Sequence, residues 1–250
     1  MRVYYNEFDK KKCAALSQLM KDGHIRKGDI DDRSIRDVQP ADVSEYDRAH
    51  FFAGIGLWDY ALDLARWPAD RPVWTGSCPC QPWGVAGAVH GRNKQEEDER
   101  DLWPVWGKLI PKGITIFGEQ VATKHALRWY DRLADDLENK NYTVRTEIKT
   151  GISEGIPQRR WRLYFAAHPG GEGMERLVKA GSAREAGSRG WRGKKDLQSI
   201  CKSPFTPGER WPQPLVRSLD DGYPERVGII HAAGDAIIPQ VAARFIQAVI

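Results

Sequence analysis

Residues 49–67, AHFFAGIGLWDYALDLARW, change their hydrophobic pattern in the middle of the stretch. The first residues form an apolar run that predicts a buried strand, and this run leads into two glycines separated by one residue. After the glycines, apolar side chains recur at helical spacing, which predicts a helix. A strand, a glycine turn and a helix in succession are typical of an α/β fold.

The same alternation of strands and helices extends in both directions from this stretch. Further strands are predicted at 1–9, 71–78, 114–121 and 159–168, and further helices at 10–21, 126–140 and 239–249. Strands that alternate with helices indicate an open, mostly parallel sheet with helices on both faces. Residues 168–226 break the pattern, because they are rich in Gly, Pro, Arg and Lys and have little periodicity. We therefore predict a main domain at 1–167, completed by 227–250, and a small irregular lobe at 168–226.

Composition limits the class of protein. A chain of 250 residues can bury one sizeable core. No run approaches the roughly 18 apolar residues of a membrane span, and the N-terminus lacks the apolar core of a secretory signal, so we expect a cytoplasmic protein without a membrane partner. The four cysteines form neither a disulfide framework nor a zinc-binding spacing, so no metal is expected. The formal net charge of +4 permits a nucleic-acid partner but does not identify one.

Ligands of such sheets bind at the carboxyl ends of the strands, where four short segments carry chemically informative residues. These segments are FAGIG at 52–56, SCPCQPW at 77–83, GEQV at 118–121 and QRRWR at 158–162. Each also has a structural explanation: a tight turn, a small buried cysteine, a solvated loop acid and a solubilising pair of arginines. Side chains alternate along a strand, so Arg160 and Arg162 are predicted to share one face.

Taken in this order, the segments resemble the motifs of the cytosine-5 DNA methyltransferase family. FAGIG is similar to the cofactor motif, PCQPW to the nucleophile motif, GEQV to the Glu-Asn-Val motif and QRRWR to the Gln-x-Arg-x-Arg motif. DERDLW at 98–103 resembles the Arg-x-x-Leu segment, and GDAIIPQVAARFIQAV at 234–249 resembles the closing helix. The resemblance implies a Rossmann-like methyltransferase fold that uses S-adenosyl-L-methionine.

The resemblance assigns four residues to catalysis. Cys80 is the implied nucleophile that adds to carbon 6 of cytosine, and Cys78 is a neighbour with a packing role. Glu119 is the implied acid at ring nitrogen 3, and Arg160 and Arg162 stabilise the charge that develops in the ring. The target base must leave the duplex, so base flipping in double-stranded DNA is implied. We expect the protein to be a monomer. Residues 84–100 are predicted to form a mobile loop over the flipped nucleotide, or a plain surface loop.

The cofactor motifs stand in an unusual order. Between FAGIG and PCQPW there is no room for the acidic strand end and the Gly-Asp-Ile segment of the family. VYYNEFD and KGDIDD at the N-terminus supply both, so we infer a local reordering of the chain; the alternative is that Glu7 is a surface acid at an edge strand. Glu7 is then expected at the ribose hydroxyls, Phe8 on the adenine ring and Asp29 at the adenine amino group. The full predicted cofactor set is Phe52, Ala53, Gly54, Ile55, Gly56, Glu7, Phe8, Asp29, Ile30, Pro79, Leu102, Asp235 and Ala236.

DNA contacts are expected from two regions. The residues are Gln81, Trp83, Gly84 and Gln158 near the nucleophile and Arg184, Arg189, Arg192 and Lys194 in the lobe. The alternative is that the lobe is a solvated basic loop. The chain departs from the family at Trp83 and Gly84, where Phe-Ser is usual, and at Gln120 and Asp235, where Asn is usual. The protein sequence does not identify the DNA sequence that is recognised, nor whether a restriction enzyme of a bacterial or phage system accompanies the protein.

Three other functions share part of this pattern. An RNA cytosine-5 methyltransferase would share all the catalytic motifs. A silent DNA-binding homologue would be expected to lack Cys80 or Glu119, and both are present. A thymidylate-synthase-like enzyme also uses cysteine addition at carbon 6 but does not need the cofactor motifs.

Overall fold

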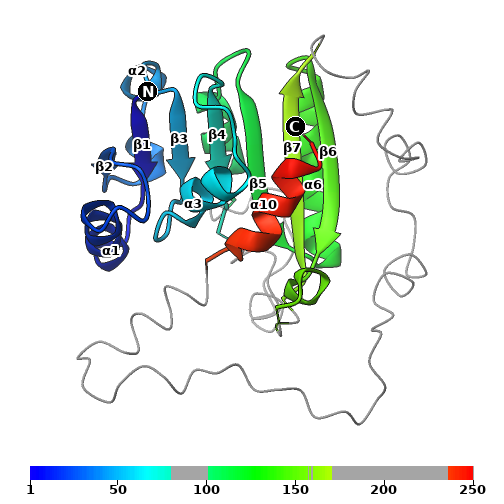
Figure 1. Cartoon of the computed structure of the whole chain (residues 1–250). Helices are drawn as coiled ribbons and strands as arrows, with labels where there is room; N and C mark the ends of the chain where they lie inside the picture. Colours follow the sequence, from blue (N-terminus) through cyan, green and yellow to red (C-terminus); the bar gives the residue numbers. More distant parts are fainter. Residues whose placement is uncertain (80–100, 157, 159, 171–235, 250) are drawn as a thin grey trace, which may run out of the picture.

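The computed structural model describes residues 1–79, 101–156, 158, 160–170 and 236–249, which form a seven-stranded sheet with helices packed on it (Figure 1). The strands are β1 Val3–Asn6, β2 Asp29–Asp31, β3 Arg48–Phe51, β4 Val73–Gly76, β5 Thr115–Val121, β6 Tyr142–Lys149 and β7 Arg162–Pro169. The helices are α1 Lys10–Lys21, α2 Pro40–Val43, α3 Leu57–Leu64, α5 Trp103–Leu109, α6 Lys124–Glu138 and α10 Pro239–Gln247, with short 3-10 helices η1 Ile35–Asp37 and η2 Gly151–Glu154.

The order of strands in the sheet is β2-β1-β3-β4-β5-β7-β6. Strands β1 to β5 are parallel, and β7 runs antiparallel to both β5 and β6. A doubly wound sheet runs 3-2-1-4-5 when its strands are numbered along the chain. In this chain, β3 occupies the position of strand 1 of that fold, β1 the position of strand 2 and β2 the position of strand 3. The fold is therefore the Rossmann-like arrangement predicted, with its second and third strands encoded ahead of the first.

The register confirms that the N-terminal strand lies beside the glycine-motif strand. Tyr5 of β1 is the partner of His50 of β3, and Asn6 is the partner of Phe51. Both strands therefore end at the same edge of the sheet, so the segments that follow them, NEFD and FAGIG, are brought together.

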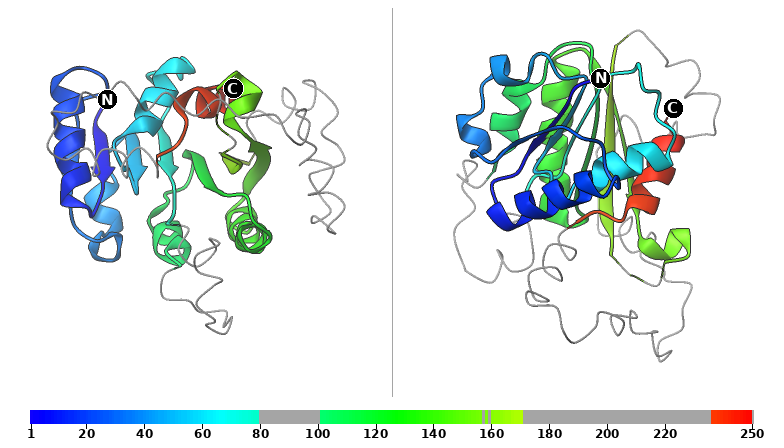
Figure 2. Two further views of the ribbon diagram at one scale, coloured as in Figure 1. Left: turned by 90° about the horizontal axis from the view of Figure 1, so that it is seen from below. Right: turned by 60° about the vertical axis from the view of Figure 1, so that its left-hand side comes forward.

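Helices cover both faces of the sheet, as the alternating pattern predicts (Figures 1 and 2). On one face, α2, α5 and α6 bury a core in which Trp74, Ile116 and Phe165 share one cluster with the tryptophans of α5 and α6. On the other face, α3 and α10 pack on Phe117 and Tyr164, and α1 packs on β1. Neighbouring strand residues such as Ile116 and Phe117 enter opposite cores because side chains alternate along a strand.

Two glycines sit side by side in the centre of the sheet. Gly76 of β4 and Gly118 of β5 are register partners. A Cβ atom on Gly76 would lie 2.7 Å from the ring of Trp106, and one on Gly118 would lie 2.2 Å from the ring of Phe165. Aromatic rings thus occupy the space that side chains would take at this level of the sheet.

A buried polar cluster fastens β3 to α3 and to the segment before β2. Arg48 and Asp59 are almost completely inaccessible, and Arg48 Nη1 donates to Asp59 Oδ1 at 2.7 Å. The backbone N–H of Arg26 donates to the other oxygen of Asp59 at 2.7 Å. Burial acts to raise the pKa of Asp59, but hydrogen bonds from His50 and Arg26 and the charge of Arg48 hold this pKa below its usual value. The cluster therefore joins the reordered N-terminal unit to the glycine-motif unit.

The limits of the elements differ from the predictions in a few places. β7 continues to Pro169, one residue beyond the predicted start of the lobe at 168, and the lobe from 171 onward lies outside the described residues. Strand β6 and helix α5 were not predicted. The predicted loop at 84–100 also lies outside the described residues.

Candidate active site

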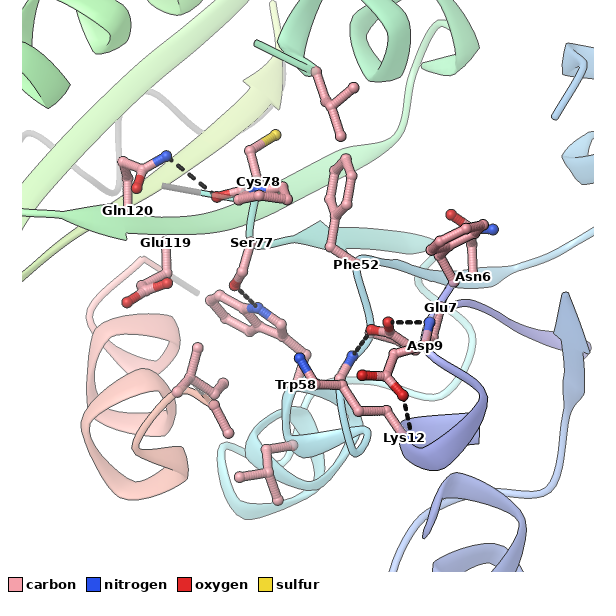
Figure 3. A pocket seen from close by; sticks show the side chains of 18 of the residues that line it. Asn6, Glu7, Asp9, Lys12, Phe52, Trp58, Ser77, Cys78, Glu119 and Gln120 are labelled. Atoms are coloured by element: carbon pink, nitrogen blue, oxygen red, sulfur yellow. Dashed lines mark hydrogen bonds between the residues drawn. The ribbon is translucent and has the colours of Figure 1, made fainter. Parts of the chain in front are cut away.

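A pocket of about 470 Å³ opens at the carboxyl edge of the parallel strands (Figure 3). Its wall is built by the segments that follow β1, β3 and β4, by the end of β5, by the segment that enters β7 and by the residues before α10. This is the place where ligands bind in doubly wound sheets, and the volume suits a nucleotide-sized ligand.

Glu7 lies at the junction of the N-terminal segment and the glycine turn. Its Oε2 accepts the backbone N–H of Gly54 at 2.7 Å, and its Oε1 accepts the backbone N–H of Asp9 at 2.9 Å. Figure 3 shows the carboxylate facing the pocket between β1 and the turn. Each carboxylate oxygen can accept a second hydrogen bond, so Glu7 can also receive hydroxyl groups of a ligand.

The glycine turn after β3 is tightly constrained. Phe52 has a φ of 52°, and Gly54 and Gly56 have φ values of 59° and 80°. A Cβ atom on Gly56 would lie 2.7 Å from Ile25 and 2.9 Å from Leu16, so only glycine fits where α3 begins. Positive φ at a bulky residue such as Phe52 is uncommon, and residues in such strained conformations cluster at functional sites. The turn therefore presents backbone to the pocket at close range.

The predicted cofactor residues are only partly brought together. Those that line the pocket are Glu7, Phe8, Phe52, Ala53, Gly54, Pro79, Leu102 and Ala236. Phe8 is 71% exposed and lies at the rim, as a residue that stacks on a ligand ring would. Ile55 and Gly56 belong to the turn but do not line the pocket, and Asp235 lies outside the described residues.

Asp29 and Ile30, which are also predicted to contact the cofactor, do not line the pocket. Asp29 is the first residue of β2 and pairs with Tyr4, two positions before the carboxyl edge. Its carboxylate is exposed and accepts the Tyr46 hydroxyl at 2.7 Å. Ser34 and Ile35, which follow β2, line the pocket instead.

The segment after β4 leads toward Cys80, which lies outside the described residues. Ser77, Cys78 and Pro79 all line the pocket. Cys78 is buried in the aromatic core beside β4, and burial raises the pKa of its thiol well above the usual value. A thiol in that state is unreactive, which agrees with the packing role predicted for Cys78.

Glu119 is buried at the end of β5, with 6% of its surface exposed. Its Oε1 lies 2.6 Å from Arg162 Nε, but the two groups are not aligned as a hydrogen bond. Burial raises the pKa of Glu119, and the charges of Arg162 and Arg160 oppose this rise. The result is a carboxyl group that holds a proton more readily than an exposed glutamate, in a pocket with cationic neighbours.

Arg160 and Arg162 do not share one face of a strand, contrary to the prediction. β7 begins at Arg162, so Arg160 precedes the strand. Both nevertheless line the pocket, as the prediction requires. Gln158 is exposed and does not line the pocket.

Gln120, which stands where the family usually has Asn, holds the segment after β4. Its Nε2 donates to the carbonyl of Cys78 at 3.3 Å, and its Oε1 accepts the N–H of Val121 at 2.9 Å. The longer side chain thus makes a contact with the chain two residues before Cys80.

Several pocket residues were not predicted. They are Asn6, Asp9, Lys12, Ser34, Ile35, Leu57, Trp58, Ser77, Gln120, Val121 and Ile237. Ser77 could have been found, because it lies in the same strand-end segment as Cys80. The predicted DNA-binding residues Gln81, Trp83, Gly84, Arg184, Arg189, Arg192 and Lys194 lie outside the described residues.

Two absences hold for the described part of the chain. There, no group of three or more His, Cys, Asp or Glu side chains could hold a metal ion. Among the helices of those same residues, none is long and apolar enough to cross a membrane.

The strand order is that of the Rossmann-like methyltransferase fold, whose cofactor is S-adenosyl-L-methionine. A family model described as C-5 cytosine-specific DNA methylase matches residues 65–204, more than half of the 250 residues. The chain belongs to the C-5 cytosine-specific DNA methylase family.

The chain is similar to a curated methyltransferase and to methyltransferases of known structure. The Type II methyltransferase M.AplI of Arthrospira platensis is 31% identical over 112 residues, which cover 43% of this chain and 31% of that protein. A Dnmt2 mutant of Spodoptera frugiperda has 14% identity and a TM-score of 0.40, covering 69% of this chain and 51% of its own. The Dnmt2 methyltransferase of S. pombe has 15% identity and a TM-score of 0.40, covering 71% and 55%. The matched region is thus about a third of the curated relative and about half of these structures.

Proposed function

We propose that this chain is a DNA (cytosine-5-)-methyltransferase that acts on a flipped cytosine in double-stranded DNA through a covalent Cys80 adduct. The observation that supports this most directly is the buried Glu119, flanked by Arg160 and Arg162, in the same pocket as the segment that leads to Cys80. A buried acid with a raised pKa beside cationic side chains suits proton donation to a base on which negative charge develops.

The residues of the other half of the pocket fit the cofactor. Glu7 offers acceptors for a ribose diol, the turn at Gly54 leaves open space where a side chain would stand, and the exposed Phe8 ring offers a surface for adenine. Ser34 and Ile35 line the part of the pocket where Asp29 was expected. When bound, S-adenosyl-L-methionine supplies an electrophilic methyl group.

The protein side of the reaction follows from these positions. The Cys80 thiolate adds to carbon 6 of cytosine, and the electron pair of the 5,6 double bond moves toward carbon 5. Glu119 donates a proton at ring nitrogen 3, and Arg162 stabilises charge at the base oxygen. Carbon 5 then accepts the methyl group, and a base or water removes the carbon 5 proton. The 5,6 double bond re-forms as the thiolate leaves carbon 6, and ring nitrogen 3 returns its proton to Glu119.

The substrate and the nucleophile can be tested together. The protein is incubated with S-adenosyl-L-methionine labelled in the methyl group and with genomic DNA or total RNA, followed by nucleoside separation. We expect labelled 5-methylcytosine from DNA. Label in RNA alone would replace the DNA assignment, and label in neither would refute the proposed activity.

The two cysteines provide a matched pair of variants. Cys80→Ala should abolish methyl transfer and leave cofactor affinity near that of the wild type, because the thiolate is used only in the chemical step. Cys78→Ala should retain activity. DNA that contains 5-fluorocytosine should form a denaturant-stable adduct with the wild type and with Cys78→Ala but not with Cys80→Ala. An adduct that persists in Cys80→Ala would contradict the assignment.

The biological setting belongs to the same proposal. One relative is named a Type II methyltransferase, which suits a modification enzyme of a restriction-modification system in a bacterial or phage-infected cell. Bisulfite sequencing of DNA from cells that express the chain would reveal the sequence it modifies.

A further inference from the structure

Trp58 and Ser77 form a hydrogen-bonded pair in the wall of the pocket. Trp58 is the second residue of α3, and Ser77 follows β4. The indole Nε1 donates to Ser77 Oγ at 3.0 Å. The Trp58 ring is 3% exposed and packs edge-on against Tyr164, so its N–H group has a fixed direction.

The pair constrains the direction of the serine hydroxyl. An indole N–H can only donate a hydrogen bond, so Ser77 Oγ must accept it, and the serine proton must point elsewhere. Figure 3 shows Ser77 between Trp58 and Glu119 on the pocket wall. The Ser77 hydroxyl is one of the groups that lower the pKa of Glu119, as a donor to the carboxylate would. Glu119 Oε1 is buried and has no aligned hydrogen bond within the described structure.

We propose that Trp58 orients the Ser77 hydroxyl as a hydrogen-bond donor to Glu119, so that the two residues position the acid of the reaction. The inference rests on the proposed function only where it calls Glu119 the acid, because the hydrogen bond from Trp58 to Ser77 does not depend on the activity. Trp58 and Ser77 are positioning residues, since they act through Glu119.

The Ser77 hydroxyl and the two arginines act on the protonation of Glu119 in the same direction. Burial favours the neutral carboxyl, whereas the arginines and the Ser77 hydroxyl favour the ionised form. The titratable and charged groups that face Glu119 are Arg160, Arg162 and its register partner Tyr164. A donor at this place keeps the acid able to release its proton to the base rather than retain it.

The pair also connects the two halves of the pocket. Trp58 follows the glycine turn directly, because Gly56 is the N-cap of α3. A displacement of the turn would therefore move the indole N–H and, through it, the Ser77 hydroxyl.

The main test is a direct titration of Glu119 in the full-length protein. Glutamate is labelled with ¹³C at the side-chain carboxyl, and the Glu119 signal is assigned by its loss in Glu119→Gln. In Ser77→Ala the pKa of Glu119 should rise by about one unit, the lower range for the loss of a hydrogen bond to a charged group. Ser77→Thr, which keeps the hydroxyl, should titrate like the wild type. An unchanged titration in Ser77→Ala would overturn the inference.

Trp58→Phe tests the orienting role separately. It keeps an aromatic ring against Tyr164 but removes the N–H, so the pKa of Glu119 should shift in the same direction and by less than in Ser77→Ala. A shift in the opposite direction would refute the orienting role of Trp58.

Kinetics then connect the pair with the reaction. If Glu119 acts in its protonated form, activity falls as pH rises through its pKa, and a higher pKa moves this alkaline limb of kcat/KM to higher pH. The limb should therefore move upward in Ser77→Ala by the amount seen in the titration, and stay in place in Ser77→Thr. If the wild type has no methyltransferase activity, the proposed function fails, but the titration still decides the inference.

Discussion

Replacement of Glu7 by alanine tests the reordered cofactor site most directly. The wild-type carboxylate accepts backbone N–H groups of Gly54 and Asp9 at 2.7 and 2.9 Å and faces the pocket. Glu7→Ala removes these contacts and the proposed acceptors for the ribose hydroxyls. The variant should therefore bind S-adenosyl-L-methionine more weakly and also hold the glycine turn less firmly.

The magnitude follows from the number and type of these bonds. A hydrogen bond to a charged group contributes about 1.5–3 kcal/mol, and the lower part of this range applies to the half-exposed Glu7. Loss of the ribose contacts should thus weaken binding by about 10- to 100-fold. Loss of the two internal bonds should lower the free energy of unfolding by about 1–3 kcal/mol. Glu7→Gln, which keeps one acceptor oxygen, should fall between the wild type and the alanine variant.

The assay is calorimetric titration of S-adenosyl-L-methionine into each variant, with turnover measured at saturating cofactor. Asp29→Ala is a suitable control, because Asp29 is an exposed carboxylate on the neighbouring strand that does not line the pocket. It should bind like the wild type, and turnover of Glu7→Ala at saturation should be largely preserved. Equal affinities of Glu7→Ala and the wild type would refute the placement of the ribose at Glu7.

Further predictions concern the acid, the buried ion pair and the glycine turn. Glu119→Gln should lower kcat by about 100-fold or more and change DNA affinity little, measured by single-turnover methylation and by filter binding. Asp59→Asn leaves the buried Arg48 without its closest anion and should lower Tm by about 6–20 °C, whereas Asp63→Asn, at a half-exposed partner 3.3 Å away, should lower it by much less; equal shifts would contradict the assigned role of burial. Because the pKa of Asp59 is lowered on folding, the stability it contributes is full above about pH 4 and is lost as pH falls further, which acid unfolding of the wild type and Asp59→Asn would reveal. Gly56→Ala should cost about 2–4 kcal/mol of stability in denaturant titration, because the backbone is left-handed there and the new methyl group would meet Ile25.

Much of the fold could be predicted from local patterns. The strand, glycine turn and helix around 49–67 were found because the hydrophobic period changes from continuous to helical within a few residues. The adjacency of β1 and β3 was inferred from the order of motifs and is confirmed by the register. Strand β6 is not evident in YTVRTEIK, because the apolar residues Tyr142, Val144 and Ile148 of one face alternate with polar and charged residues and form no continuous apolar run.

The site was predictable where function depends on residue type and much less so where it depends on register. Glu119, Arg160 and Arg162 are assigned by the resemblance of GEQV and QRRWR to family motifs of fixed residue types, and all three line the pocket. Asp29 was placed by its resemblance to a Gly-Asp-Ile segment, but the pairing of β2 with β1 sets it opposite Tyr4 and away from the carboxyl edge. Strand pairing is a tertiary property, and a register shift of two residues along β2 cannot be predicted from the sequence of that segment.

The paired glycines at the centre of the sheet limit how this protein can diverge. Gly76 and Gly118 each leave a space that one aromatic ring fills, Trp106 in the first case and Phe165 in the second. Neither glycine can gain a side chain by itself, and neither ring can shrink without leaving a void under the strands that carry the pocket. Each glycine and its ring should therefore be inherited as a unit, so that accepted replacements at one position appear in lineages that have already changed the other.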